Sequence, residues 1–370
     1  MNNELPDGWK KYKLGEIIEL LYGKGLREQD RKPGNIPVYG SNGIIGYHNT
    51  PLVKGPGIII GRVGSIGKIN YSPVDFYPID TAYYVNLKKH NIDMKFLYYL
   101  LFTLPMNKLN FQSAVPGLNR NIAYSLDVAI PPLPEQRAIA SIFPPIEDKI
   151  ELLRQENETL EAMAETIFKQ WFIKDPENKE VLLKDIYVFE KGFEPGSSNY
   201  LETEGDNTIR FIRLKDMDNK NSSIFIKKSL AKNICAPDDL LVAFDGSPGK
   251  IGFGIEGAFS SGIRKVYSVN ETYNNVWLKY LIFKSKPIQN TIKTYSTGTI
   301  IQHAGSCIDK LTFKFPEESK IKEFNELITP IFIKIQQNTQ QIQTLSQLFD
   351  TLLHGLMSGK LRVDDVLCQS

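Results

Sequence analysis

Cysteine and histidine are scarce in this sequence, and neither occurs at a spacing that suggests a site. The chain has 370 residues, of which three are cysteines and four are histidines. These residues are Cys235, Cys307, Cys368, His48, His90, His303 and His354. None has metal-ligand or redox-motif spacing, so the sequence predicts no bound metal and favours a reduced, cytoplasmic setting.

Long apolar runs are also missing. The longest, at residues 96–104, is interrupted by polar residues and ends at Pro105, whereas a membrane-spanning helix needs about 20 apolar residues. The N-terminus lacks the apolar core of a signal peptide. With 42% hydrophobic and 23% charged residues, the chain is expected to be a soluble globular protein of two or more domains.

Recognisable catalytic motifs are absent as well. A GxGxxG match at residues 252–257 is followed by AFSSG, a poor helix start, so we interpret it as a strand hairpin. Two GSxGK segments, 64–68 and 246–250, depart from a P-loop because Arg62 replaces the required glycine and Ile69 follows the first lysine. We interpret them as turns between strands, whose lysines either touch a phosphate backbone or are solvated.

The most prominent pattern that is present is a heptad repeat after Pro145. Apolar residues recur at alternating spacings of three and four, with Asn157 in one polar core position. The apolar core positions are Ile150, Leu153, Leu160, Ala164, Ile167 and Trp171. Such a pattern predicts a long helix that needs a partner helix.

A second heptad pattern runs from Pro316 to about Met357, again with one asparagine, Asn338. We predict an antiparallel coiled coil in which Asn157 meets Asn338, since a buried asparagine pair fixes register. The predicted layers join Leu160 with Ile335, Leu153 with Ile342, Ile150 with Leu345, Ile167 with Ile328, and Trp171 with Phe324. The alternative is that each helix packs on its own domain and both asparagines are solvated.

Prolines interrupt both helical stretches. A proline inside a helix removes a backbone hydrogen bond and bends the axis. We therefore expect a break or kink near Pro144-Pro145 and at Pro330, with Pro145 and Pro330 in the first turns of the longer helices.

The chain also contains an internal repeat. The GSxGK segments are offset by 182 residues, and the same offset relates Tyr98 to Tyr280 and Pro134-Glu135 to Pro316-Glu317. Glycine-rich turns between apolar segments predict strands, and residues 93–104 and 276–286 have helical length. We predict an α+β fold in which each half is a globular block with a twisted, mostly antiparallel sheet, followed by a long helix.

The repeat predicts four segments with alternating charge. Residues 1–133 form the first globular block and carry a net charge of +5, and residues 134–180 form the first helix, with its break near Pro144-Pro145, and carry −5. Residues 181–315 form the second block with +4, and residues 316–370 form the second helix and tail with −2. Basic blocks suggest nucleic acid, although a small positive excess also occurs on ordinary solvated surfaces.

Loops in both blocks combine cations, amides and aromatic residues, as DNA-contacting loops do. The candidate DNA-binding residues of the first block are Lys24, Arg27, Arg31, Tyr39, Ser41, Asn42, His48, Arg62, Lys68, Asn119 and Arg120. Those of the second are Ser197, Asn199, Tyr200, Arg210, Arg213, Lys215, Lys250, Arg264, Thr297, Thr299, Gln302 and His303. Many of these residues are expected to be ordinary surface positions.

Together, these sequence features resemble those of one known protein family. The segment from Ser113 to Phe143, SAVPGLNRNIAYSLDVAIPPLPEQRAIASIF, followed by the heptad helix, resembles the specificity subunit of type I restriction-modification enzymes. IPVYGSNGIIGY and FYPIDTAYYV also resemble segments of that family's target-recognition domains. The resemblance covers the whole chain, but Pro144-Pro145 interrupts a stretch where the family continues a helix, and Pro316-Glu317-Glu318 replaces the Pro-Glu-Gln of the first copy.

The resemblance implies a non-catalytic role. Each block would recognise one half of a split double-stranded DNA target, and the coiled coil would separate the blocks and hold two copies of a methylation subunit. Restriction and translocase subunits would join this complex, and S-adenosylmethionine, ATP and Mg²⁺ would bind to the partners. About 27 helical residues span roughly 40 Å, close to one turn of DNA.

Two other functions are compatible with the sequence. One is a stand-alone DNA-binding or scaffold protein without a methylation partner, which exposed apolar residues outside the coiled-coil core would argue against. The other is a nucleotide-binding enzyme that uses the glycine-rich turns, which a failure to bind any nucleotide would exclude.

Overall fold

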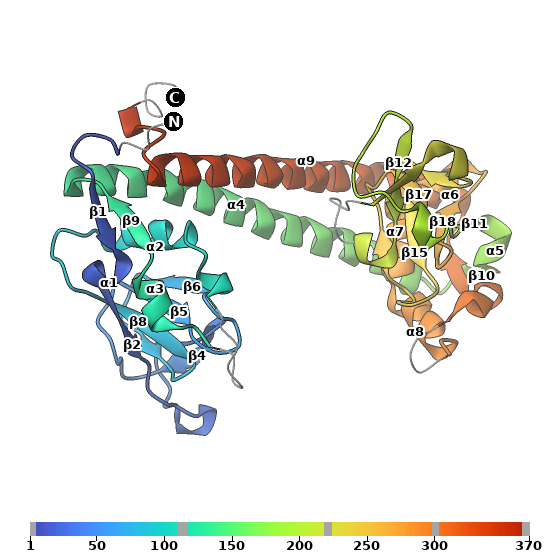
Figure 1. Ribbon diagram of the computed structural model, residues 1–370. Helices are drawn as coiled ribbons and strands as arrows, with labels where there is room; N and C mark the ends of the chain where they lie inside the picture. The colour runs from blue at the N-terminus through green and yellow to red at the C-terminus, as the bar shows by residue number, and fades with distance from the viewer. Residues whose placement is uncertain (1–4, 110–116, 218–223, 298–302, 365–370) are drawn as a thin grey trace. The chain divides into compact units, whose positions relative to one another are not determined.

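A computed structural model describes residues 5–109, 117–217, 224–297 and 303–364 (Figure 1). The chain divides into two compact units. Unit 1 comprises Met1–Leu153 and Gln340–Ser370, and unit 2 comprises Arg154–Thr339. The long helices α4 (Leu133–Phe168) and α9 (Glu318–Met357) each contribute residues to both units.

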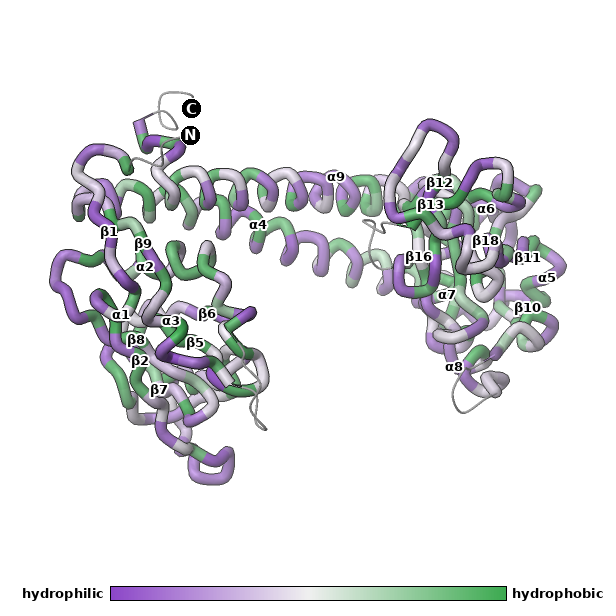
Figure 2. The backbone as a smooth tube through the Cα atoms, in the orientation of Figure 1, coloured by the Kyte–Doolittle hydropathy of each residue, from purple (hydrophilic) through white to green (hydrophobic). Residues whose placement is uncertain are grey.

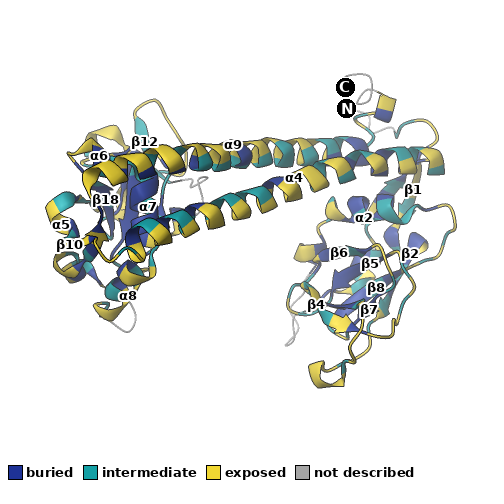
Figure 3. Ribbon diagram, turned by 180° about the vertical axis from the view of Figure 1, so that it is seen from behind, coloured by how far each residue is buried: buried dark blue, intermediate teal, exposed yellow. Residues whose placement is uncertain are grey.

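Unit 1 is built on a four-stranded antiparallel sheet in the order β2-β8-β5-β6. Its strands are β2 (Ile18–Tyr22), β8 (Ala82–Leu87), β5 (Gly57–Gly61) and β6 (Ile69–Ser72). Every residue of β5 is buried (Figure 3), which explains its unbroken apolar sequence. Helix α2 (Met94–Phe102) packs against β5 and β6.

Smaller elements complete unit 1. Strand β3 (Ile36–Gly40) lies between β4 (Gly43–His48) and β7 (Tyr77–Pro78). Strand β1 (Lys10–Lys13) pairs with β9 (Asp127–Ile130). Two short helices, α1 (Leu14–Ile17) and α3 (Arg120–Tyr124), pack against each other.

Unit 2 repeats this plan. Its first sheet has the order β11-β18-β15-β16, which matches β2-β8-β5-β6 strand for strand. The strands are β11 (Val188–Lys191), β18 (Ile263–Tyr267), β15 (Leu240–Ala243) and β16 (Ile251–Gly252). Strands β10 (Lys179–Leu182) and β19 (Thr312–Phe315) pair as β1 and β9 do. The internal repeat in the sequence is therefore a repeat of the fold.

Unit 2 also contains a second sheet and short α-helices. The sheet order is β13-β12-β17-β14, from β13 (Phe225–Lys227), β12 (Thr208–Ile212), β17 (Gly257–Phe259) and β14 (Ile234–Cys235). The helices are α5 (Leu183–Ile186), α6 (Glu271–Asn274), α7 (Val276–Lys284) and α8 (Lys286–Thr294). Among the described strands only β3–β7 and β12–β17 pair in parallel, so the predicted α+β fold with mostly antiparallel sheets is confirmed.

The GSxGK segments connect strands in both units, as predicted. The first joins β5 to β6 and the second joins β15 to β16. Gly67 has a φ of 71°, and a Cβ placed on it would lie 2.5 Å from the carbonyl carbon of Met106. Only glycine tolerates both constraints. The interpretation of residues 252–257 as a strand hairpin is wrong, because β16 and β17 belong to different sheets.

The expected break at Pro144-Pro145 is not present. Helix α4 contains both prolines, and α9 contains Pro330, so these residues do not begin the helices. A kink of the helix axis at either place remains a prediction. A proline has a φ value compatible with a helix, but it removes one N–H donor and its ring crowds the carbonyl of residue i−4. The neighbouring Phe143 is fully buried, and its packing offsets the loss. A π-helical turn, Lys169–Ile173, follows α4.

The predicted antiparallel register is confirmed at two layers within unit 2. The Asn338 Nδ2 donates to the Asn157 Oδ1 at 2.9 Å, and the Trp171 and Phe324 rings lie 5.9 Å apart. Ile167, Ile328 and Ile335 belong to the same apolar core. Hydrophobic and hydrophilic residues alternate along both long helices (Figure 2). The other layers remain predictions.

We expect Asn338→Ala to lower the free energy of unfolding by about 1–3 kcal/mol, because it leaves polar partners unsatisfied. Asn338 is only 1% exposed, and it also donates to the Glu156 Oε2 at 3.0 Å. Urea unfolding of the full chain measures the loss. The double variant Asn157→Leu/Asn338→Leu should recover stability, since it replaces both amides with apolar groups. A double variant as unstable as Asn338→Ala would contradict a paired asparagine layer.

Candidate nucleic-acid interface

In unit 1 the structure brings two predicted arginines onto one exposed tyrosine. The Arg120 guanidinium carbon lies 4.6 Å from the centre of the Tyr22 ring, and that of Arg62 lies 5.3 Å from it. Tyr22 ends β2 and is 50% exposed. Its neighbour on β8 is Tyr83, at a ring distance of 5.0 Å. Guanidinium groups held against aromatic rings are oriented before any ligand arrives.

A second group of predicted residues lies around the first GSxGK turn. The Lys68 Nζ donates to the Asn42 Oδ1 at 2.8 Å, and the Ser65 Oγ donates to the same atom at 3.4 Å. Ser41 lies beside this turn, because a Cβ on Gly64 would come within 3.3 Å of its Oγ. Asn42 and Lys68 are exposed. A cation and an amide are therefore presented together.

Several other predicted residues of unit 1 have internal partners. Tyr39 is 5% exposed and packs on Phe76, while His48 is 9% exposed and its Nδ1 accepts from the Lys32 N–H. Asn119 caps the N-terminus of α3. The Arg31 Nη1 donates to the Ile45 carbonyl at 2.8 Å. These contacts support the fold, whereas Lys24 and Arg27 lie exposed.

In unit 2 the structure brings Tyr200 and Arg213 together. The Arg213 guanidinium carbon lies 5.9 Å from the Tyr200 ring, and its Nε donates to the Asp216 Oδ2 at 2.9 Å. The carboxylate thus holds this arginine beside the ring. Lys215 is exposed next to it, and Ser197 and Asn199 lie in the short 3₁₀ turn that precedes Tyr200.

Other predicted cations of unit 2 are held by the protein itself. Arg264 is 8% exposed and donates to the carbonyls of Ser261 and Ile263, and burial lowers the pKa of its guanidinium. Burial also lowers the pKa of Arg210. The Lys250 Nζ donates to the Leu214 carbonyl at 2.9 Å. These side chains are therefore less available to a ligand than the sequence suggested.

The loop before residue 304 is described only in part. The His303 Nδ1 lies 2.9 Å from the Asp245 Oδ1, and the Thr297 and His303 backbones exchange two hydrogen bonds. The predicted residues Thr299 and Gln302 lie outside the described residues. His303 thus links this loop to the second GSxGK turn, which begins at Gly246.

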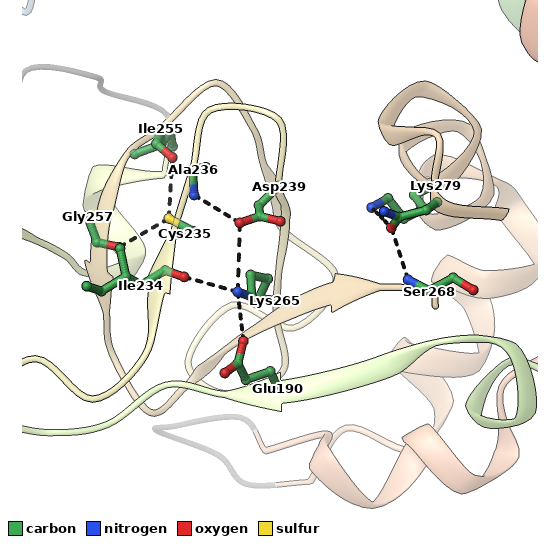
Figure 4. A network of polar contacts seen from close by, with 11 residues as sticks. Glu190, Ile234, Cys235, Ala236, Asp239, Ile255, Gly257, Lys265, Ser268 and Lys279 are labelled. Atoms are coloured by element: carbon green, nitrogen blue, oxygen red, sulfur yellow. Dashed lines mark hydrogen bonds and ion pairs between the residues drawn. The ribbon is translucent and has the colours of Figure 1, made fainter. Parts of the chain in front are cut away.

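The polar network that surrounds Lys265 holds strands together (Figure 4). The Lys265 Nζ lies 2.9 Å from the Glu190 Oε2 on β11 and 3.1 Å from the Ile234 carbonyl on β14. Nearby, the Cys235 thiol donates to two carbonyls, and its pKa is raised to about 12, mainly by burial. A thiol with that pKa is a poor nucleophile. The network is therefore structural.

Tyr22 and Tyr83 were not among the residues selected from the sequence. A signal was present, because Tyr22 directly precedes Gly23-Lys24-Gly25 in a basic loop. The pairing of β2 with β8, which brings the two tyrosines together, could not be read from local sequence. Across the described ranges, no cluster of metal-binding side chains and no helix long and apolar enough to span a membrane is found.

Comparisons with known proteins find similar sequences. Residues 6–162 match the type I restriction modification DNA specificity domain. Over 98% of the chain, 26% of residues are identical to the type I restriction enzyme MjaIX specificity subunit of Methanocaldococcus jannaschii, and 96% of that protein is covered. A segment of 107 residues, 27% of this chain and 23% of the relative, is 35% identical to the HindI specificity subunit of Haemophilus influenzae.

A solved structure supports the fold over nearly the full length. The crystal structure of the type I restriction-modification system S subunit from M. genitalium aligns with a TM-score of 0.68 at 18% identity, covering 96% of this chain and 97% of that one. At this identity the likeness shows the fold alone. In sequence and in fold, the chain is therefore similar to type I restriction-modification DNA specificity subunits.

Proposed function

We propose that this chain is the DNA target-recognition subunit of a type I restriction-modification complex. The full-length match to a specificity subunit carries the proposal. The repeated fold supports it, because two similar blocks with different loops suit a target with two different halves. In this role residues 1–133 recognise one half and residues 181–315 the other, without catalysing a reaction.

Exposed apolar side chains on the long helices support the recruitment of partners. Two lie on α4 and three on α9, and they are between 44% and 57% exposed. These residues are Leu152, Met163, Leu327, Ile333 and Leu348. Apolar side chains that stay exposed on a helix are typical of surfaces that another protein covers.

The partners we propose are two copies of a DNA methylation subunit, joined by restriction and translocase subunits. The approximate repeat within one chain would present two similar docking surfaces. S-adenosylmethionine, ATP and Mg²⁺ would then belong to those partners, in a cytoplasmic complex that methylates adenine and cleaves unmodified DNA.

Genome-wide mapping of methylated adenine tests this function. Cells that express this chain with its neighbouring methylation subunit are compared with cells that lack the chain. We expect a split motif, two short defined halves around a fixed spacer, that disappears with the chain. A folded, co-purifying chain that directs no methylation would instead favour a stand-alone DNA-binding or scaffold protein.

Exchange of one block tests the division of labour. When residues 181–315 are replaced by the equivalent block of another family member, we expect one half of the motif to change and the other half to stay. The reason is that each block folds around its own sheet. The reciprocal exchange of residues 1–133 is the matched control. A chimera with altered bases at both ends would contradict the modular arrangement.

A further inference from the structure

The cluster of Tyr22, Arg62, Tyr83 and Arg120, called here the Tyr22 cluster, forms where three adjacent strands end. Tyr22 is the last residue of β2 and pairs with Tyr83 of β8. Arg62 directly follows Gly61, the last residue of β5, and Arg120 begins α3. Rigid elements therefore position all four side chains, within unit 1 alone.

Internal contacts hold the two guanidinium groups in place. The Arg120 Nη1 donates to the Leu20 carbonyl at 3.1 Å, while its guanidinium carbon lies 4.6 Å from the Tyr22 ring and 5.6 Å from the Tyr83 ring. The backbone of Arg62 is also fixed, since its N–H donates to Thr81 and its carbonyl accepts from Leu118. Little conformational entropy remains to be lost when a ligand binds.

The cluster concentrates positive charge without an acidic partner. Within the described ranges, neither Arg62 nor Arg120 forms an ion pair with a carboxylate, and the buried Arg62 Nε has no hydrogen-bond partner. The Tyr22 pKa is lowered by a hydrogen bond from Tyr83 and by the charges of Arg120 and Arg62, whereas burial raises that of Tyr83 to about 12. Two neighbouring cations that lack counter-charges favour a ligand rich in acceptors.

We propose that the Tyr22 cluster binds the acceptor edge of a guanine in the half-site read by residues 1–133. This inference rests on the proposed function. The O6 and N7 atoms of guanine accept a planar guanidinium fork in the major groove. An arginine held over an aromatic ring has a restricted orientation, which suits the planar acceptor pattern of a base edge. The exposed Lys24 and Lys68 suit the phosphate contacts nearby.

Arginine-to-lysine substitutions remove the planar guanidinium fork but keep the positive charge. They therefore test whether the fork itself is needed. The full chain is assembled with its methylation subunit, and binding to duplexes that carry each base pair at every motif position is measured. We expect Arg120→Lys or Arg62→Lys to weaken cognate binding by about 5- to 150-fold. The loss should be confined to duplexes with one particular G·C pair, so that discrimination at this position falls. Tyr22→Leu should give the same pattern, because it removes the aromatic ring over which both guanidinium groups lie.

Arg137→Lys is the matched control. Arg137 lies on α4 in the same unit and its side chain is 69% exposed, so this variant should bind as the wild type does. The far-UV circular dichroism and thermal unfolding of each variant chain, compared with the wild type, report on its folding. If one variant fails to fold, the remaining two decide the result.

Three results would overturn the inference. The first is DNA binding that weakens equally for all sequences, with the slope of log affinity against log salt concentration reduced by about one. This pattern indicates a phosphate contact. The second is unchanged binding in all folded variants. The third is a half-site for residues 1–133 without any G·C pair. If the wild-type chain directs no split motif, the proposed function fails instead, so the two failures are distinguishable.

Discussion

Replacing Phe324 with alanine is expected to lower the free energy of unfolding of unit 2 by about 3–5 kcal/mol, the usual cost of removing a buried aromatic side chain. Phe324 is fully buried on α9, and its ring lies 4.7 Å from that of Phe172 and 6.1 Å from that of Phe168. It also contacts Trp171, the layer predicted from the heptad pattern. The loss therefore measures how strongly the end of α4 packs against α9.

Guanidinium chloride unfolding of the full chain, followed by tryptophan fluorescence, measures this effect. Leu327→Ala is the matched control, because Leu327 lies one turn away on α9 and is 46% exposed. We expect the control to change the unfolding free energy by about 0.5 kcal/mol or less. A loss below about 1 kcal/mol for Phe324→Ala would contradict the packing of these aromatic rings.

Replacing Lys279 with methionine is expected to stabilise the protein at neutral pH by up to about 3 kcal/mol, because each unit of pKa shift corresponds to about 1.4 kcal/mol. Lys279 is 1% exposed on α7, and burial lowers its pKa to about 8. Its Nζ donates to the Asn274 Oδ1 at 3.0 Å, and that oxygen also accepts from the Ser268 N–H. In the variant, the Asn274 Oδ1 would therefore still accept a hydrogen bond from the Ser268 N–H.

The stabilisation should depend on pH in a defined direction. Between about pH 8 and pH 10.5, an unfolded chain keeps a proton on Lys279 that the folded chain has lost, so the wild type gains stability as the pH rises. The advantage of Lys279→Met is thus largest below pH 8 and shrinks toward pH 10.5. Acidic neighbours oppose the shift without cancelling it; they are Asp239, Asp238 and Glu271.

Urea unfolding of the wild type and of Lys279→Met at pH 7 and pH 10 measures the difference in their free energies of unfolding. The effects of other titrating groups are shared by both proteins and cancel in this difference. Lys232→Met is the control, because Lys232 is exposed and its removal should have little effect at either pH. Equal stability of wild type and Lys279→Met at pH 7 would show that Lys279 is not destabilised by burial. A large advantage that persists at pH 10 would assign the gain to packing instead of charge.

The long helices and their pairing were predictable because their signal is local and periodic. Each heptad residue faces its partner at a spacing set by the helix itself, so the heptad pattern alone matches Asn157 with Asn338 and Trp171 with Phe324. The prolines misled the expectation of a helix break, because a propensity argument counts the lost hydrogen bond and omits the packing of residues such as Phe143.

The candidate interface was only partly predictable. Residue type identified Arg62, Arg120, Asn42 and Lys68, since cations and amides in glycine-rich loops suit nucleic acid. Residue type cannot report burial, so Tyr39, His48 and Arg264 were selected although the fold encloses them. Tyr22 was missed for the opposite reason, because its significance comes from neighbours that are distant in the sequence.

By itself, the sequence determined the repeat, two layers of the helix register and the fold class, because each depends on periodicity or on motifs that are local along the chain. The tertiary structure alone decided which loop residues are exposed and which of them meet. Strand pairing between β2, β8 and β5 brings Tyr22, Tyr83 and Arg62 to the same end of one sheet, and that pairing depends on contacts between segments that are far apart in the chain. Long-range contacts of this kind carry no local signal, and they determine which side chains are positioned together at the surface.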